Sequence, residues 1–447
     1  MLGWRFPMRI LRSWHALGCA AALLLVAAGP RPVSGQLLGP EFRVNSYTTS
    51  HQQFPAVEAD AAGNFVVVWA SQGQEDPDFA GVFGQRYDAA GAPVGGEFQV
   101  NTFTTQIQSE PAVAMDDSGN FIVVWESNGQ DGSLFGIFGQ RFNPSGVPQG
   151  AEFPVNTFTT GMQNTPAVAV DGSGDFVVVW QSYGQDGNMS HYSVFGRRFN
   201  SSGTPASGEF QVNTFTTGPQ RDPSVAMNAA GDFVIAWQSY LQDGAFYSIV
   251  GRRYSAAGTP QGGEFLVNSV TTNNQVVPAV AADGVGNFVV VWEDKAADGS
   301  GYGVFGQRYD LGGATLGGQF LVNSRTTFDQ RNPAIAANDA GEFVVTWHSY
   351  EQDGSLDGVF GQRYSPAGGK AAGEFQLNTY TTERQMLSTV AADEEGRFVV
   401  AWRSWLQDGS TYGVYGRRVA ALVFADGFES SDVCGWTSAV GSGDVCP

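Results

Sequence analysis

An apolar run that ends in tryptophan recurs seven times along this chain. One copy reads Phe121-Ile-Val-Val-Trp125, with β-branched residues and no polar alternation, as expected for a strand covered on both faces. Successive closing tryptophans are 56, 55, 57, 55, 55 and 55 residues apart: Trp69, Trp125, Trp180, Trp237, Trp292, Trp347 and Trp402. A Phe-x-Val/Leu-Asn motif keeps step at Asn45, Asn101, Asn156, Asn213, Asn268, Asn323 and Asn378. A fixed period of this size indicates a repeat architecture, in which no unit buries its apolar face alone.

Each unit is predicted to hold four short strands, separated by turns rich in Gly, Asp and Asn. In the second unit we expect strands at Pro111–Ala114, Phe121–Trp125, Ile137–Phe142 and Glu152–Asn156. No stretch shows the 3.6-residue period of a helix. Seven such units predict an all-β fold, a seven-bladed β-propeller of four-stranded blades spanning residues 36–421. A β-solenoid is the main alternative, but its repeats are usually much shorter.

The phase of the repeat predicts how the ring closes. The first unit is preceded by a fourth strand, Glu41–Asn45, whereas the last unit ends on a third strand, Gly413–Val419. If the Pro111-type strands are innermost, Glu41–Asn45 would complete the last blade as its outer strand. Pairing the two ends in this way would leave few open strand edges.

The first 35 residues have the pattern of a secretory signal peptide. Arg5, Arg9 and Arg12 precede an apolar stretch at Ala16–Ala28, which is too short to span a bilayer, and small residues around Gly35 suit signal-peptidase cleavage. No later run is long and apolar enough to cross a membrane. We therefore expect a soluble, monomeric protein exported to the cell surface, the medium or the periplasm.

The charge of the chain excludes two classes of partner. The formal net charge is −20, and without the signal segment, which carries four Arg and no acid, 19 basic side chains face 43 acidic ones, a charge of −24. Such a chain repels nucleic acid and anionic lipid. The charge favours solubility, and calcium or a cationic partner is the alternative explanation.

Two cysteines follow the repeats, in a C-terminal tail at residues 422–447. In an oxidising compartment we expect Cys434 and Cys446 to form a disulfide. The repeats contain no cysteine, and nothing in the sequence matches a zinc site or a redox motif.

The candidate ligand-binding residues lie in a loop that carries Gln-Asp-Gly. The strand order places this loop on the same face as a Thr-Thr loop, such as the one with Thr104 and Thr105, and beside Tyr183, Tyr240, Tyr350 and Trp405. Amides, carboxylates and aromatic rings together could bind sugar hydroxyls. The alternative is that each Asp caps backbone amides of its own turn. The candidates are Gln130, Asp131, Gln185, Asp186, Gln242, Asp243, Asp298, Gln352, Asp353, Gln407 and Asp408.

Two other repeated sets are interpreted as structural. Arginines of the third strand (Arg86, Arg141, Arg198, Arg253, Arg308, Arg363 and Arg418) are expected to pair across strands with the acids that follow them (Glu97, Glu152, Glu209, Glu264 and Glu374). Asp-x-x-Gly-Asn hairpins at Asp60, Asp116, Asp171 and Asp283 resemble calcium loops but lack the later bidentate Glu, so we interpret them as turns and assign no metal ligand.

No catalytic residue is assigned. The histidines after the signal segment, His51, His191 and His348, lie in different units, and the sequence contains no nucleophile elbow, His-Glu-x-x-His motif or phosphate-binding loop. Seven nearly equal units also favour repeated binding contacts over a single reaction centre.

The amino-acid sequence of the repeat resembles that of a bacterial protein family. The segments Phe-Val-Val-Val-Trp180-Gln-Ser-Tyr-Gly-Gln-Asp-Gly, Val-Phe-Gly-Arg-Arg-Phe199 and Glu-Phe-Gln-Val-Asn213-Thr-Phe-Thr-Thr are similar to a repeat of large exported and surface proteins, many described as hemolysin-type calcium-binding. The resemblance covers Glu41 to Val419 and implies export and a role outside the cell, without an established catalytic activity. The glycine-rich calcium nonapeptides of such proteins are absent. The tail, from Val423 to Asp432 with Trp436, resembles a short C-terminal segment of Gram-negative exported proteins and implies a sorting element or a cap.

These observations predict an exported, non-enzymatic binding or adhesion propeller. Its partner would be a glycan or a surface protein that docks on the Gln-Asp-Gly face. A secreted hydrolase or lyase with its site in the central channel, and a purely structural surface protein, remain as alternatives.

Overall fold

The computed structural model describes residues 37–421, which form strands, turns and loops without a helix. The expected signal peptide at residues 1–35 and the expected Cys434–Cys446 disulfide lie outside these residues. Within residues 37–421, no helix has the length and hydropathy needed to cross a membrane.

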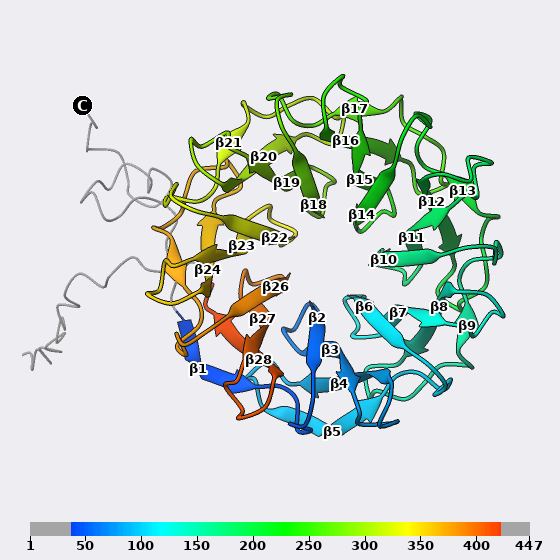
Figure 1. Ribbon diagram of the computed structural model, residues 1–447, viewed down its shortest axis with the longest axis vertical. Helices are drawn as coiled ribbons and strands as arrows, with labels where there is room; N and C mark the ends of the chain where they lie inside the picture. The colour runs from blue at the N-terminus through cyan, green and yellow to red at the C-terminus, as the bar shows by residue number, and fades with distance from the viewer. Residues whose placement is uncertain (1–36, 422–447) are drawn as a thin grey trace, which may run out of the picture. The chain divides into compact units, whose positions relative to one another are not determined.

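Seven four-stranded antiparallel sheets are arranged as blades around a central axis (Figure 1). The inner strands are β2 (Gln52–Ala59), β6 (Gln108–Met115), β10 (Gln163–Val170), β14 (Gln220–Met227), β18 (Gln275–Ala282), β22 (Gln330–Ala337) and β26 (Gln385–Ala392). The second strands are β3 (Phe65–Gln72), β7 (Phe121–Asn128), β11 (Phe176–Tyr183), β15 (Phe233–Tyr240), β19 (Phe288–Lys295), β23 (Phe343–Tyr350) and β27 (Phe398–Trp405).

The third strands are β4 (Ala80–Tyr87), β8 (Phe135–Phe142), β12 (Tyr192–Phe199), β16 (Tyr247–Tyr254), β20 (Tyr302–Tyr309), β24 (Asp357–Tyr364) and β28 (Tyr412–Val419). The outer strands are β5 (Pro93–Gln99), β9 (Phe153–Pro154), β13 (Phe210–Gln211), β17 (Phe265–Leu266), β21 (Phe320–Leu321), β25 (Phe375–Gln376) and β1 (Leu37–Arg43). Blades 1 to 6 follow one another along the chain, starting with β2–β5. Blade 7 consists of β26, β27, β28 and β1. The predicted seven-bladed propeller is confirmed.

The hydrophobic core lies between blades rather than inside them. In each blade the second strand is buried from its first residue to its tryptophan, and all seven tryptophans are fully buried, as predicted. One cluster joins Val66 and Val82 of blade 1 to Phe121 and Trp125 of blade 2. Because each blade covers a face of the next, the apolar second strands are removed from water only when the blades stack.

An asparagine after each outer strand fastens that strand to its own blade, and in every case except Asn213 it also bonds to the next blade. The Oδ1 atom of Asn101 accepts a hydrogen bond from the amide of Val82 at 2.7 Å, within blade 1. Its Nδ2 group donates to the carbonyl of Phe103 at 2.9 Å and to Oε1 of Gln108 at 3.3 Å, at the start of blade 2. Gln108 is fully buried, so this bond satisfies a polar group that water cannot reach.

The ring closes through β1, as the phase of the repeat predicts. Strand β1 pairs antiparallel with β28, with Phe42 opposite Gly416 and Arg43 opposite Tyr415. The two strands lie side by side in Figure 1, although they come from opposite ends of the described chain. The Oδ1 atom of Asn45 accepts from the amide of Val414 at 2.7 Å, which repeats the asparagine contact of the other blades.

Most expected strand limits differ from the structure by a few residues: β7 runs to Asn128, β8 begins at Phe135, and β1 covers Leu37–Arg43. The inner strand predicted at Pro111–Ala114 begins three residues earlier, at Gln108, because a bulge lets the polar segment before the proline join the sheet. The outer strand predicted at Glu152–Asn156 is regular only over Phe153–Pro154. The residues after it bond through the asparagine side chain and single backbone contacts.

The expected arginine–glutamate pairs do not form among the described residues. Instead, Arg86 donates to the carbonyl of Pro144 in the next blade at 2.8 Å. Glu152 accepts from the amide and the hydroxyl of Thr102 in the preceding blade, at 2.6 and 3.0 Å. The prediction was wrong because a neighbouring blade, which a single repeat does not reveal, supplies a carbonyl acceptor for the arginine and hydrogen-bond donors for the glutamate. Both sets of residues therefore join blade to blade.

Deleting residues 37–45 should lower the melting temperature by more than about 10 °C, because blade 7 loses its outer strand and the ring opens. The deletion also removes Phe42, whose ring lies 6.4 Å from that of Phe65 and 5.3 Å from that of Tyr87. The measurement is thermal unfolding followed by circular dichroism.

A circular permutant is the matched control for this deletion. It would carry residues 37–45 after residue 421 through a short linker, so that the same strand follows β28 directly. We expect its melting temperature to stay close to that of the parent chain. An unchanged melting temperature in the deletion variant would show that β1 does not hold the ring closed.

Candidate binding face and axial channel

The Gln-Asp-Gly loops and the Thr-Thr loops share one end of the propeller, which we call the loop face. In blade 2 the first residue of the inner strand, Gln108, pairs with Ser127 near the end of the second strand. The amide of Asn128 then bonds to the carbonyl of Ile107 at 2.9 Å, which joins the two loops. The same register recurs in all seven blades.

The polar atoms of the Gln-Asp-Gly loops bond mainly to the protein itself. Gln185 donates to Glu209 at 2.6 Å and Gln242 to Glu264 at 2.7 Å. The corresponding bonds join Gln130 to Glu152, Gln352 to Glu374 and Gln407 to Glu41.

Each aspartate of the set accepts from the amide two residues later, namely Asp131, Asp186, Asp243, Asp298, Asp353 and Asp408. These are the contacts of a capped turn. That the same residues also bind a ligand stays a prediction.

Aromatic side chains and arginines stand between these loops and the central axis. Tyr183 and Tyr240 end their second strands, and their rings contact Tyr192 and Tyr247 at 5.3 and 5.1 Å. Arginine guanidinium groups lie over rings of this face at 4.9, 4.3 and 4.4 Å, in the pairs Arg221–Tyr192, Arg331–Tyr302 and Arg403–Tyr412. Such stacking orients each guanidinium group and leaves its edge free to donate hydrogen bonds.

The largest aromatic group of the loop face joins blade 7 to blade 1. The ring of Trp405 lies 4.7 Å from that of Tyr412 and 6.3 Å from that of His51. All three side chains are half-buried, so each keeps an exposed part. Because Arg403 stacks on Tyr412, the group combines apolar ring surface with a cation. We call Trp405, Tyr412 and His51 the aromatic platform.

The third residue of every inner strand forms a bulge with a left-handed backbone. The φ angles lie between 47° and 55°, although none of the residues is glycine: Phe54, Glu110, Thr165, Asp222, Val277, Asn332 and Leu387. This conformation is costly for β-branched residues such as Thr165 and Val277. Proline follows in six blades and Ser388 in the seventh. Six of the seven residues line a cavity of about 270 Å³ on the axis, and their types differ from blade to blade.

In blades 2 to 5, the residue after the tryptophan supports the bulge of the next blade. Glu293 accepts from the amide of Asn332 at 2.6 Å, and Gln238 accepts from the amide of Val277 at 3.1 Å. Blades 1, 6 and 7 lack this acceptor, since they carry Ala70, His348 and Arg403 at the same position. This position and the bulge are therefore two places where the repeat varies in its chemistry.

Three carboxyl groups meet on the blade 2 to blade 4 side of the channel. Burial raises the pKa of Glu110, and the negative charges of Glu126 and Asp222 raise it further. Burial also raises the pKa of Glu126 and of Asp222, while Arg221 lowers that of Asp222. Glu126 accepts from the hydroxyl of Ser109 at 2.8 Å. The sequence did not predict this cluster, because each of its residues is marked there only by a departure from the repeat.

A further buried carboxyl, that of Glu58 on β2, breaks the repeat near the opposite end of the inner strand from the bulge. Burial raises its pKa to about 8, so the side chain carries a proton at neutral pH. The other six blades have alanine at this position: Ala114, Ala169, Ala226, Ala281, Ala336 and Ala391.

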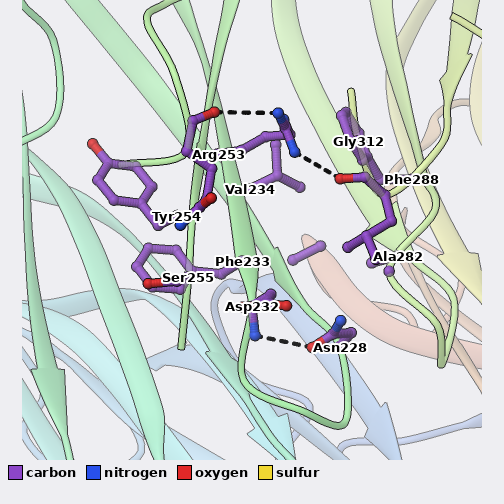
Figure 2. Close-up of a pocket in the computed structure, with 14 residues that line it drawn as sticks. Asn228, Asp232, Phe233, Val234, Arg253, Tyr254, Ser255, Ala282, Phe288 and Gly312 are labelled. Atoms are coloured by element: carbon purple, nitrogen blue, oxygen red, sulfur yellow. Dashed lines mark hydrogen bonds between the residues drawn. The ribbon is translucent and has the colours of Figure 1, made fainter. Parts of the chain in front are cut away.

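Clefts also open between neighbouring blades at the end opposite the loop face. The largest, between blades 4 and 5, has a volume of about 440 Å³ (Figure 2). Its arginine is already bonded: Arg253 reaches across the cleft to the carbonyl of Leu311 at 2.6 Å and also bonds that of Gln261 at 3.2 Å. The rings of Phe233 and Phe288 in its wall are each only 3% exposed. We therefore regard this cleft as a gap in blade packing and not as the candidate site.

The described residues suggest no metal centre. Within residues 37–421, no group of three or more His, Cys, Asp or Glu is placed to hold a metal ion. The hairpin aspartates act as turn acceptors: Oδ1 of Asp116 accepts from the amides of Ser118 and Asn120, at 3.0 and 2.9 Å.

Comparisons with known proteins give similarity in fold only. No protein-family model and no curated protein sequence matches the chain. A structure of unknown function from Dyadobacter fermentans is 10% identical, covers 87% of this chain and 100% of its own, and has a TM-score of 0.51. The polysaccharide lyase Uly1 is 11% identical over 87% of this chain and 98% of its own, with a TM-score of 0.49. An α-L-arabinanase from Penicillium chrysogenum is 12% identical over 69% and 94%, with a TM-score of 0.47.

Replacing Glu58 by alanine should stabilise the protein at alkaline pH. The folded-state pKa of about 8 lies above the unfolded value of 4.5, so the charged carboxyl destabilises the fold fully above pH 8. The penalty shrinks as the pH falls from 8 to 4.5 and vanishes below that. We expect a gain of roughly 2–4 kcal/mol at pH 9, from about 1.4 kcal/mol per pKa unit less the effect of partial solvation. Urea unfolding at pH 9 and pH 4 measures it, and an equal gain at both values would contradict the raised pKa.

Proposed function

We propose that the chain is an exported, non-enzymatic binding propeller that recognises a glycan on its loop face. The aromatic platform carries this proposal. Half-buried rings of Trp405, Tyr412 and His51 offer flat apolar surface of the kind that stacks on sugar rings. Arg403 stands beside them and can donate to sugar oxygens.

The exposed residues of the loop face support docking of a partner there. Large apolar side chains that are at least 40% exposed occur in its loops: Ile107, Leu134, Met189, Leu241, Phe246, Phe328 and Leu406. Protein interfaces are enriched in aromatic residues, Met and Arg, and this face carries all of them. The end groups of a long glycan or its carrier could cover this surface around the platform.

The Gln-Asp-Gly loops supply the rigid rim of the proposed site. Their glutamines bond to the glutamates of the outer strands, and those glutamates bond in turn to the preceding blade. A rim fixed in this way loses little conformational entropy when a ligand binds. The sequence also predicts that the same Gln and Asp side chains contact the ligand directly, and this stays a prediction.

The export part of the proposal rests on the sequence. The first 35 residues have the signal-peptide pattern, and the strongly acidic chain suits neither nucleic acid nor anionic lipid as a partner. A glycan or a protein outside the cytoplasm is the partner class that remains.

A glycan array probed with the purified chain should show selective binding, and Trp405→Ala should weaken it at least about tenfold, because the largest ring of the platform is lost. Tyr183→Ala removes an aromatic residue at the same strand position in blade 3 and should change the affinity little. Titration of the best array ligand by calorimetry measures both variants.

Other results would change the assignment. Equal losses in both variants would replace the single platform by equivalent sites on several blades. Loss of binding in Asp186→Ala with an unchanged melting temperature would assign ligand contact to the Gln-Asp-Gly loops. A blank array would contradict glycan recognition and favour a protein partner.

A hydrolase or lyase that works in the channel is the second candidate function. The observation that favours it is the group of Glu110, Glu126 and Asp222, because carboxyl groups with raised pKa values and mutual charge are typical of general acids. Against it, the carboxylate of Glu126 is already engaged, since it accepts a hydrogen bond from the hydroxyl of Ser109.

If the channel is catalytic, a screen of polysaccharides should detect cleavage that Glu110→Gln abolishes. This substitution keeps the shape of the side chain and removes its titration. Under our main proposal, the screen detects no new reducing ends or unsaturated products from either protein. Cleavage by the parent chain that the variant lacks would overturn the non-enzymatic assignment.

A further inference from the structure

Four basic side chains gather on the loop face beside the aromatic platform. Arg331 of β22 and His348 of β23 are opposite each other in blade 6. Arg403 of β27 is opposite Met386 in blade 7, and Arg384 lies just before β26, bridged to Asp357 of β24. Blades 6 and 7 thus bring three guanidinium groups and an imidazole to one side of the channel mouth, in a chain whose net charge is −20.

Carboxylates neutralise two of the three arginines. Arg331 pairs with Glu293 at 3.1 Å, and Arg384 pairs with Asp357 at 3.2 Å. Arg403 has no carboxylate partner within residues 37–421. Its Nη atoms contact Oε1 of Gln53 at 3.3 Å and the sulfur of Met386 at 3.1 Å, and its Nε has no partner there. One positive charge at this mouth is therefore left without a counter-charge.

His348 faces the same group with a free nitrogen. It occupies the position at which Glu293 and Gln238 accept a backbone amide of the next blade. Among the described residues its Nδ1 atom has no hydrogen-bond partner, and the residue is 7% exposed. Burial, together with the charges of Arg331, Arg403 and Arg384, lowers its pKa to about 3. The imidazole is thus neutral and lies in a positive field that a bound anion would relieve.

We infer that Arg403, Arg331 and His348 form a pocket for the carboxylate of an acidic sugar whose ring stacks on the aromatic platform. This inference rests on the proposed glycan-binding function and names the class of glycan. A single unneutralised guanidinium matches the single negative charge of a uronic acid, which it can bind through two parallel hydrogen bonds. The adjoining rings explain why a sugar, and not a free anion, would be selected.

The pocket is open to a ligand. The side chains of Arg331 and Arg384 are 40% and 47% exposed, and Trp405 and Tyr412 are half-buried. Arg403 joins the two parts of the site, since its guanidinium group stacks on Tyr412 while Met386 and Gln53 hold it in place. A carboxylate at this point would extend the contacts that Arg403 already makes.

Calorimetric titration of the purified chain with methyl glucuronide, and with methyl glucoside as the neutral probe, tests the inference. The glucuronide should bind at least about tenfold more tightly, since a charge-assisted hydrogen bond typically contributes that factor or more. Arg403→Gln should abolish the difference, and Arg403→Lys should keep part of it because the charge remains. Arg43→Gln makes the same charge change on the exposed edge of β1 and should leave the difference intact.

Other results would each contradict one part of the proposed site. Equal affinities for the two probes would overturn the carboxylate pocket but keep a glycan site, whereas no binding of either probe, with a blank glycan array, would overturn the proposed function itself. Acetate that binds as tightly as the glucuronide would overturn the sugar requirement. If Arg403→Gln lowers the melting temperature, the preference of the parent chain for the glucuronide and its decline with added NaCl still answer the question.

Discussion

The structure depends on one packing constraint, namely that the second strand of every blade is apolar on both faces. Val66, Val67 and Val68 are each fully buried, and so is the tryptophan that follows them. A sheet with such a strand needs a cover on each side, and a neighbouring blade provides it. A linear stack would leave its two end blades half-covered and would need capping units. A closed ring has no ends, so β1 crosses to β28 and the last blade becomes like the others.

Stacking also determines which residues must repeat. The asparagines after the outer strands, the buried glutamines of the inner strands and the glutamates of the outer strands all satisfy donors or acceptors of adjoining segments. Their hydrogen bonds join one blade to the next and fix the loops at the loop face. The side chains that repeat most faithfully are therefore engaged in the scaffold. Side-chain chemistry that differs from blade to blade occurs at positions that the scaffold does not specify, such as the bulge and the residue after the tryptophan.

This division explains what could be predicted from the sequence. The period and the Phe-Val-Val-Val-Trp runs predicted the fold, and the phase of the first strand predicted its closure. The start of the inner strand at Gln108 was missed because a left-handed residue before proline interrupts the strand pattern. The pairing of Glu152 was wrong because its donor, Thr102, belongs to the preceding blade. His348 and Arg403 break the repeat visibly after Trp347 and Trp402, but their meaning depends on contacts between blades that no single repeat contains.

The channel mouth carries a carboxyl cluster on one side and a partly neutralised arginine group on the other, and this arrangement is a reason to propose binding rather than catalysis. Carboxyl groups gather on the side of blades 2 to 4, and arginines gather around His348 on the side of blades 6 and 7. General acid–base cleavage of a glycosidic bond usually places two carboxyl groups on opposite sides of that bond. Here the three clustered carboxyl groups share one side, and Glu58 stands apart from them. An acidic ligand would instead be attracted to one wall of the mouth and repelled from the other, which fixes its orientation on the aromatic platform without any chemical step.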